Sequence, residues 1–172
     1  MRNNPTSPEL LAQYPHLVPR ELHPNMSCAA LAAKNLRIEL KRDFPGLKFK
    51  VQSENFAGGS SVRAYAEVFR CDGYTDQDLR ELDNKLGRLR GQFAYGNFDG
   101  MTDSYDYKSD PGIRAFQDAF GSASYVFADV RFAHASVEAV ELERRAAKKK
   151  EQLEKVAAKA AARSSGPTTP KL

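Results

Sequence analysis

The residues with the clearest spacing for chemistry are four aspartates in the segment FDGMTDSYDYKSD. Asp99, Asp103, Asp106 and Asp110 follow one another at intervals of four, three and four residues. A row of carboxylates can hold a hard metal ion, or it can imitate nucleic-acid phosphates and occupy a basic groove on another protein. The calcium-loop pattern is missing, because Gly100 follows Asp99 directly and no glutamate ends the loop. We therefore predict Asp99, Asp103 and Asp106 as partner contacts and expect no metal site; Asx turns are the alternative.

Lysines and arginines form two candidate sites for phosphate or for an acidic partner. The first combines a helix face with one face of a strand pair, and its tyrosine offers a ring on which a base could stack. The second opens a basic segment near the C-terminus. An ordinary solvated surface is the alternative for both. The first set is Lys34, Arg37, Lys41, Lys48, Lys50, Arg63 and Tyr65, and the second is Arg144, Arg145, Lys148 and Lys149.

Residue types for catalysis or cofactor binding are scarce. Two cysteines and three histidines are too few for a disulfide framework or a cysteine-based zinc site. His134 is the only histidine outside residues 1–26, and its position suits a boundary between elements better than a general base. The Gly58-Gly59-Ser60-Ser61 run lacks the lysine of a P-loop, so we interpret it as a hairpin loop. We expect no cofactor and no enzymatic activity; acid-base chemistry in the aspartate segment is the remaining alternative.

The basic character of the chain belongs to one segment. The net charge is +4 and the pI is near 9.1. Residues 1–143 nevertheless hold 17 Lys and Arg against 20 Asp and Glu, whereas residues 144–163 hold eight against two. Charge therefore argues for a nucleic-acid partner through that segment only. Because no run of about 18 apolar residues is present and the start is polar and proline-broken, we expect a cytoplasmic protein with no membrane partner.

The elements that position these residues begin with a helix and a strand pair. Residues 1–26 contain five prolines and predict an extended arm. Ser27 is a plausible cap for a helix that runs to about Arg42, where the FPG sequence ends it. Residues 47–52 and 62–69 alternate in polarity, which predicts an antiparallel hairpin with a long, mobile loop.

The second half of the chain contains three further helical patterns. A capping-box pattern and leucines at three-four spacing predict a helix over residues 76–93. After a long loop, a short helix runs from about Pro111 to Phe120, with Ile113 directed inward. Residues 122–132 carry apolar side chains on both faces, which predicts an interior strand. The last helix spans residues 136–163.

We therefore predict an α+β fold: a small mixed or antiparallel sheet with helices packed on one face, plus a long basic C-terminal helix. Lys48, Lys50, Arg63 and Tyr65 then share the face of the sheet away from the helices. The predicted parts are an extended arm (1–26), the α+β domain (27–134), the basic helix (135–163) and a disordered tail (164–172).

Three stretches, LKRDFPGLKFKV, AGGSSV and FDGMTDS, resemble a large polyvalent protein associated domain of phages and conjugative elements, over roughly residues 30–133. One departure follows the second strand. The family usually has a tryptophan and then Asp-Gly-Pro-Thr there, whereas this chain has CDGYT and no tryptophan. The resemblance implies a role beside mobile-element DNA as it enters a new host, with no assigned chemistry.

The residues and the resemblance together predict a non-enzymatic phage or mobile-element protein. We expect it to counter a nucleic-acid-based host defence, of the anti-CRISPR or anti-restriction type, by direct binding. Its partner would be a host defence protein or ribonucleoprotein complex in the cytoplasm of the bacterial host. The alternative is an accessory protein that binds DNA or RNA and escorts or coats mobile-element DNA. Self-association into a homodimer stays open.

Overall fold

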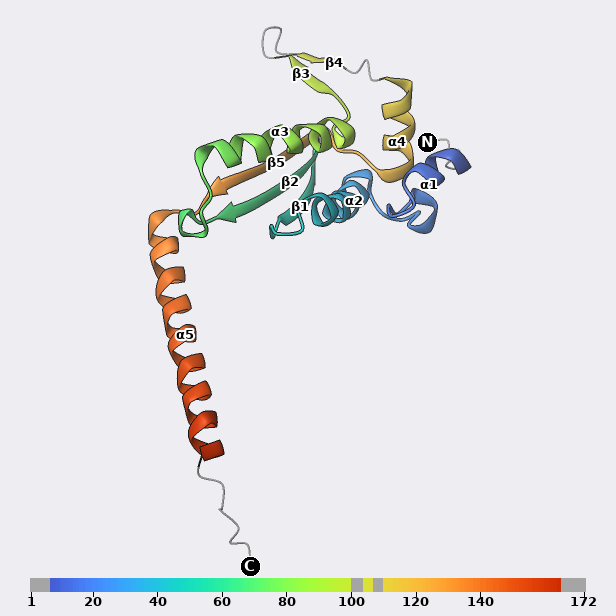
Figure 1. Cartoon of the computed structure of the whole chain (residues 1–172). Coiled ribbons are helices and arrows are strands. Elements are labelled where there is room, and N and C mark those ends of the chain that lie inside the picture. Colours follow the sequence, from blue (N-terminus) through green and yellow to red (C-terminus); the bar gives the residue numbers. More distant parts are fainter. Residues whose placement is uncertain (1–6, 100–103, 107–109, 165–172) are drawn as a thin grey trace, which may run out of the picture. The chain divides into compact units, whose positions relative to one another are not determined.

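A computed structural model describes residues 7–99, 104–106 and 110–164, in two compact units (Figure 1). The first unit contains α1 (Pro8–Gln13), η1 (Arg20–Leu22), α2 (Cys28–Asp43), β1 (Lys50–Phe56), β2 (Gly59–Val68), α3 (Asp76–Phe93), β3 (Asn97–Asp99), β4 (Ser104–Asp106), α4 (Pro111–Phe120) and β5 (Tyr125–Phe132). The second contains η2 (Arg70–Asp72) and α5 (Ala135–Ser164). The predicted α+β fold with a long C-terminal helix is confirmed.

A three-stranded mixed sheet in the order β1-β2-β5 lies at the centre of the first unit. β1 is antiparallel to β2, with Val51 opposite Ala64, and β2 is parallel to β5, with Ala64 opposite Ala128. The hairpin is therefore confirmed, but its connection is a two-residue turn between Phe56 and Gly59 and not a long loop. β1 continues through polar residues because it is an edge strand, exposed everywhere except Val51.

β5 lies at the other edge of the sheet, so the predicted interior strand is wrong. Val126, Ala128 and Val130 are buried, whereas Phe127 between them is 49% exposed. Apolar residues therefore occur on both faces of β5 although only one face is covered. At the outer edge, Arg90 of α3 donates a hydrogen bond of 2.9 Å to the Ala128 carbonyl.

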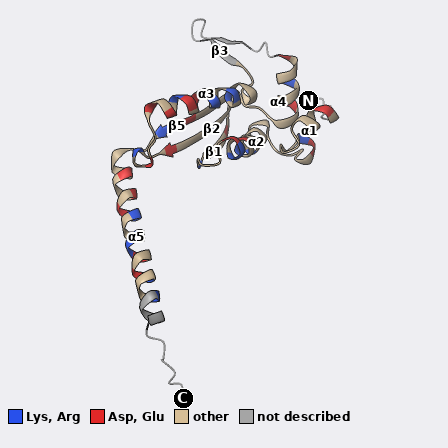
Figure 2. Ribbon diagram, in the orientation of Figure 1, with Lys and Arg blue, Asp and Glu red and all other residues tan. Residues whose placement is uncertain are grey.

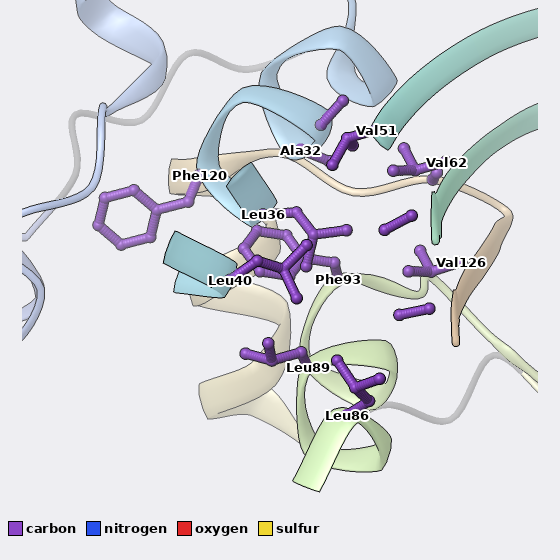
Figure 3. Packing of buried hydrophobic residues seen from close by; sticks show 14 of the residues in the cluster. Ala32, Leu36, Leu40, Val51, Val62, Leu86, Leu89, Phe93, Phe120 and Val126 are labelled. Atoms are coloured by element: carbon purple, nitrogen blue, oxygen red, sulfur yellow. The ribbon is translucent and has the colours of Figure 1, made fainter. Parts of the chain in front are cut away.

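The helices α2 and α3 cover one face of the sheet, and α4 packs against both of them. Buried side chains of the helices, such as Leu36 and Phe93, meet the strand residues Val62 and Val126 in one cluster (Figure 3). Alternate residues of a strand point to opposite faces, so the buried strand positions all belong to the covered face. Burying each such side chain contributes about 1.5–3 kcal/mol. The predicted packing of helices on one face is confirmed.

Side-chain caps begin α2 and α3 where the sequence predicts them. Ser27 Oγ accepts the Ala30 N–H at 3.2 Å. Thr75 Oγ1 accepts the Asp78 N–H at 3.2 Å, and Asp78 in return accepts the Thr75 N–H at 2.7 Å. Hydrogen bonds from the Thr75 hydroxyl and N–H lower the pKa of the Asp78 carboxyl, because they favour its ionised form. Both helix starts are thus encoded locally.

α4 packs closely against α2. Phe116 and Phe120 are buried, whereas Ile113 is 40% exposed and not directed inward as the sequence predicts. The helix ends at Gly121, whose φ is +90°. A Cβ atom at this glycine would lie 2.6 Å from the Ala32 backbone nitrogen, so only glycine permits this approach.

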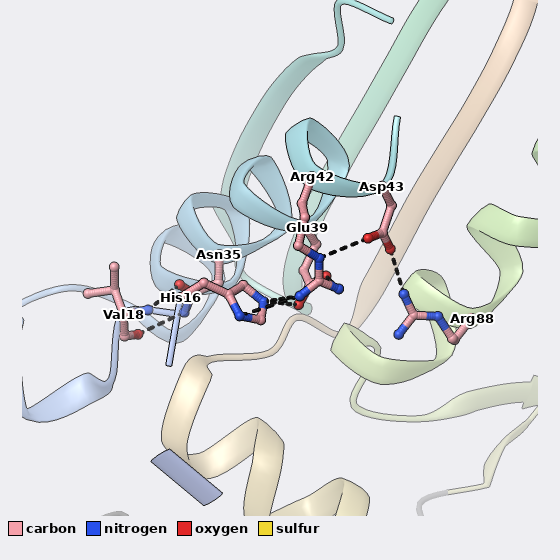
Figure 4. A network of polar contacts seen from close by, with 7 residues as sticks. All are labelled: His16, Val18, Asn35, Glu39, Arg42, Asp43 and Arg88. Carbon is pink, nitrogen blue, oxygen red and sulfur yellow. Dashed lines mark hydrogen bonds and ion pairs between the residues drawn. The ribbon is translucent and has the colours of Figure 1, made fainter. Parts of the chain in front are cut away.

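The N-terminal segment is not the extended arm that the prolines predict. Pro8–Gln13 form α1, because Ser7 caps the helix and proline suits its first turn. Leu17 is buried in the core of the first unit. The N–H and C=O of Val18 both bond to the buried Asn35 side chain, each at 2.8 Å (Figure 4).

A fully buried carboxylate, Glu39 of α2, joins this segment to the helices (Figure 4). Its two oxygens lie 2.8 Å from His16 Nε2 and 2.6 Å from Arg42 Nη2. Arg42 also binds Asp43 at 2.9 Å, and Asp43 lies 2.6 Å from Arg88 of α3. A buried charge is tolerated only with such partners, so the network fixes how the segment meets the helices.

In the second unit, the η2 turn contacts the start of α5. The Cys71 N–H donates to Glu138 Oε1 at 2.8 Å, and Asp72 pairs with Arg145. The Arg145 guanidinium also lies 5.5 Å from the centroid of the Phe69 ring. These contacts hold η2 against the first turns of α5.

Candidate functional site

The face of the sheet away from the helices is open and carries the predicted hairpin residues. Lys50 on β1 lies opposite Tyr65 on β2, and Arg63 follows at the next position on the same face. Lys48 precedes β1 and is exposed. Sequence alternation therefore placed Lys50, Arg63 and Tyr65 together correctly.

β5 adds aromatic residues that the sequence interpretation did not assign to a site. Phe127 lies opposite Arg63, and Phe56 at the end of β1 is 45% exposed. The ring centroids of Phe56 and Tyr125 are 6.0 Å apart. Those of Tyr125 and Phe127 are 6.5 Å apart, with the rings inclined by only 2°. The three rings form a row across the open face, and the alternation of β5 was the signal that could have located them.

Three cations of the open face lie near aromatic rings of that face, two of them at Tyr65 and one at Phe127. The Lys50 ammonium is 5.5 Å from the Tyr65 ring centroid, and the Arg131 guanidinium is 5.1 Å from the same centroid. The Arg63 guanidinium lies 5.8 Å from the Phe127 ring centroid. Such contacts contribute about 0.5–1 kcal/mol each at exposed sites. They keep a positive charge beside a ring, so a phosphate and a base could bind at neighbouring positions.

Acidic side chains limit the positive charge of the open face. Glu67 pairs with Arg131 at 3.0 Å. Glu54 and Asp129 stand on the same face by register, opposite Ser61 and Tyr65. The face is therefore aromatic with interspersed charges of both signs and not a strongly basic patch.

A shallow hollow of about 550 Å³ adjoins the open face at the edge of β1. Arg37 of α2 and Arg63 of β2 both line it, with backbone and side-chain groups of β1 between them. Arg37 Nη2 donates to the Val51 carbonyl at 2.5 Å, which holds this side chain at the edge of the sheet. The structure thus brings together two arginines from separate elements.

The other cations of the first predicted set lie elsewhere. Lys34 Nζ is 2.6 Å from His23 Nε2 in the N-terminal segment. Lys41 is exposed on α2. Arg37, at the centre of this helix face, contacts the hairpin through the Val51 carbonyl, whereas membership of Lys34 and Lys41 in one patch with the hairpin stays a prediction.

The predicted acidic loop contains a ribbon of two short strands. β3 and β4 pair antiparallel, with Asn97 opposite Asp106 and Asp99 opposite Ser104. The long loop predicted here is therefore partly wrong, while Asp103 lies outside the described residues. A partner contact through Asp99, Asp103 and Asp106 stays a prediction. Among the residues that the structure describes, no group of three or more His, Cys, Asp or Glu is arranged to hold a metal ion.

α5 carries the second predicted set of cations, and Figure 2 shows both charge signs along this helix. Arg144 and Arg145 bind Glu141 at 2.6 and 2.9 Å. These hydrogen bonds, from Arg144 first and then Arg145, lower the pKa of the Glu141 carboxyl to about 2. Lys148 and Lys149 are exposed, and neither forms an ion pair within the described range. None of the described helices is long and apolar enough to span a membrane.

Comparison with known proteins identifies the domain that carries the open face. A protein-family model described as large polyvalent protein associated domain 29 matches residues 27–133. This range runs from the cap of α2 to the residue after β5, so it includes the whole sheet and excludes α1 and α5. No curated protein and no solved structure matches the chain.

Proposed function

Because the chain belongs to the large polyvalent protein associated domain 29 family, which suggests an association with phages and mobile genetic elements, we propose that it is an accessory protein that binds single-stranded nucleic acid. The observation that carries the proposal is the row of three rings, of which Phe56 and Phe127 are about half exposed, with Arg63 beside Phe127. The proposed binding surface is the open face of the sheet, made of Lys50, Phe56, Arg63, Tyr65, Tyr125, Phe127 and Arg131.

Exposed rings on a rigid sheet suit unpaired bases. Every base has a flat apolar face, and stacking on an aromatic side chain contributes about 1–3 kcal/mol per base. In a duplex the bases are stacked on one another and unavailable. The surface therefore favours single strands over duplexes and places little constraint on base identity.

The exposed rings have no evident role in stability. Phe127 and Phe56 are about half exposed, while the core on the opposite face is complete without them. An exposed apolar group of this kind indicates an interaction surface more often than a structural one when several lie together. Contact with a base would cover the rings and leave the neighbouring cations for phosphate.

The charges of the surface set the expected salt dependence. Arg63, Lys50 and the hollow beside Arg37 can contact two or three phosphates, since Arg131 is already paired with Glu67. For single strands with that number of contacts, affinity falls roughly 7- to 18-fold between 50 and 200 mM salt. A protein that bound mainly through α5 would lose more.

Inhibition of a host defence complex by direct binding is the other function predicted from the sequence. The described residues hold no feature that favours it over nucleic-acid binding, since the side chains of the acidic ribbon lie outside them. It stays a proposal, and it becomes the preferred one if nucleic acid does not bind.

The test is a fluorescence-anisotropy titration of the full chain with labelled single strands of about ten nucleotides and the matching duplexes. We expect DNA and RNA single strands to bind more tightly than either duplex, because only unpaired bases can stack. The absence of single-strand binding at low salt would refute the proposal, as would equal binding of duplexes.

Three variants locate the surface. Phe127→Ala is expected to weaken binding, and Phe127→Leu nearly as much, because leucine is apolar but cannot stack. Full binding by Phe127→Leu would instead show that this ring does not stack on a base. Arg63→Gln is expected to weaken binding, whereas Arg80→Gln, the same change at an exposed arginine on α3, should not.

A further inference from the structure

α5 carries an apolar seam that its own unit does not cover. Leu142, Leu153 and Val156 are 48%, 61% and 66% exposed, although leucine and valine are usually buried. They belong to a series with successive spacings of three and four residues, the spacing of the contact positions of a coiled coil. The series, called the α5 seam here, is Ala139, Leu142, Ala146, Lys149, Leu153 and Val156.

We propose that the α5 seam binds the α5 seam of a second copy of this chain, with the two helices antiparallel. α5 has 30 residues and is therefore about 45 Å long, ample for three heptads. From Leu142 to Lys159 the helix is exposed on every side. An isolated helix gains most of its stability from packing an apolar face, and a second copy offers a matching one.

Antiparallel pairing fits the sizes of the seam residues. In the register that centres the seam, Leu142 lies opposite Leu153 of the second copy. The remaining layers pair Val156 with Ala139 and Lys149 with Ala146. The alanines allow close approach, and the aliphatic stem of Lys149 can lie along an alanine while its ammonium group reaches water.

The residues that flank the seam give this arrangement complementary charges. In the antiparallel register, Glu143 lies beside Lys150 of the second copy, and Glu138 lies beside Lys159 of the second copy. Symmetry makes each of these attractive pairs occur twice. Glu138 Oε1 also accepts the Cys71 N–H at 2.8 Å, which holds this side chain at the start of α5.

The parallel arrangement has the opposite charge pattern. In a parallel pair, a flanking residue on one side of the seam lies beside the flanking residue five positions later in the second copy. Glu138 would face Glu143, and Arg145 would face Lys150, and both contacts are repulsive. The charges of α5, acidic near its start and basic beyond Arg144, therefore select the antiparallel dimer.

This inference concerns α5 and does not depend on the proposed nucleic-acid surface. A dimer would carry two open sheet faces, however, and could hold one long strand at two places. The affinity for a strand that reaches both faces would then exceed the affinity for a short strand by more than the statistical effect of having two sites.

The test is sedimentation of the full chain at low salt from low to high micromolar concentration. We expect a concentration-dependent equilibrium of monomer and dimer. Leu153→Glu should raise the dissociation constant about tenfold or more, because it places a charge in a central layer. Val140→Glu is the matched control, since Val140 is 65% exposed but lies off the seam. Circular dichroism must show the same helix content for both variants.

A charge exchange tests the direction of the helices. In the antiparallel dimer, Glu143→Lys meets Lys150 of the second copy and should weaken association about two- to fivefold. Adding Lys150→Glu should restore it. A monomer at every concentration would overturn the proposal, as would equal effects of Leu153→Glu and Val140→Glu. Stronger association of Glu143→Lys would overturn the antiparallel arrangement, because a parallel dimer places the new lysine beside Glu138.

Discussion

The open sheet face and the α5 helix both present exposed cations, but different structures support them. On the open face Lys50 and Arg63 lie beside aromatic rings that a packed core holds in place. On α5, Arg144 and Arg145 are bound to Glu141 on a helix that is exposed over most of its surface. α5 has the greater charge, whereas the open face has the fixed geometry. The comparison teaches that charge alone does not identify a recognition surface.

Truncating a buried side chain beneath the open face should give the largest effect, a loss of stability. Phe93 is fully buried beneath the sheet, so Phe93→Ala should lower the free energy of unfolding of the first unit by about 3–5 kcal/mol. Near-ultraviolet circular dichroism and urea denaturation measure this loss. Phe56→Ala, at a ring that is 45% exposed and pairs with Tyr125, should lower the stability by only about 0.5–1.5 kcal/mol. If both changes were equally costly, the exposed ring would belong to the core.

Direct comparison of the two surfaces in binding should give the next largest effect. Phe127→Ala should weaken single-strand binding about 5- to 150-fold, the equivalent of one lost stacking contact. The double variant Lys148→Gln and Lys149→Gln should weaken it only about two- to threefold, since exposed charges on α5 add a screened attraction. Anisotropy titrations of both proteins on one oligonucleotide measure the ratio. The reverse order would assign binding to α5.

Removing the side-chain cap of α3 should lower the free energy of unfolding by a smaller amount. Only the first unit should be destabilised. Thr75→Ala removes the hydroxyl of the capping box and should cost about 1 kcal/mol of stability. Glu141→Gln, in the second unit, should leave the urea midpoint of the first unit unchanged. A shared shift of that midpoint would show that the two units unfold together.

The smallest effect is a pH dependence of the second unit. The pKa of Glu141 lies at about 2, below its ordinary value of 4.5, because Arg144 and Arg145 stabilise the carboxylate. The ion pairs therefore stabilise the start of α5 fully above pH 4.5, and this stabilisation declines as the pH falls and is lost once it falls through about 2. Arg145 lowers the pKa of the Asp72 carboxyl in the same direction. NMR titration of the two carboxyl carbons measures both, and ordinary midpoints would show that the pairs do not form in solution.

Local patterns predicted much of the fold. Ser27 and Thr75 marked the helix starts, and alternation identified the paired strands, because caps and strand polarity are set by neighbouring residues. The same rules misassigned β5, since apolar residues on both faces occur in an interior strand and also in an edge strand with exposed rings. They also missed α1, because the prolines hid a six-residue helix that Ser7 caps.

The residues of the candidate site likewise fall into those that a local pattern grouped correctly and those that only the fold brought together. Lys50, Arg63 and Tyr65 were grouped correctly, because they alternate within one hairpin. Phe127 and Arg131 joined them only through the parallel pairing of β2 with β5, across more than 60 residues of chain. Arg37 reached them through the packing of α2 beside β1, which helix periodicity could not show, because it gives the spacing of residues on α2 but not where α2 packs.

By itself, the sequence determined the starts of α2 and α3, the hairpin, the separation of a basic helix from a nearly neutral domain, and the family of residues 27–133. These depend on contacts between near neighbours or on the order of residues along the chain. Only the tertiary structure decided that one face of the sheet stays open and that rings from β1 and β5 meet there. That outcome depends on the order of strands and on the side that the helices cover, which are set by long-range packing of the core.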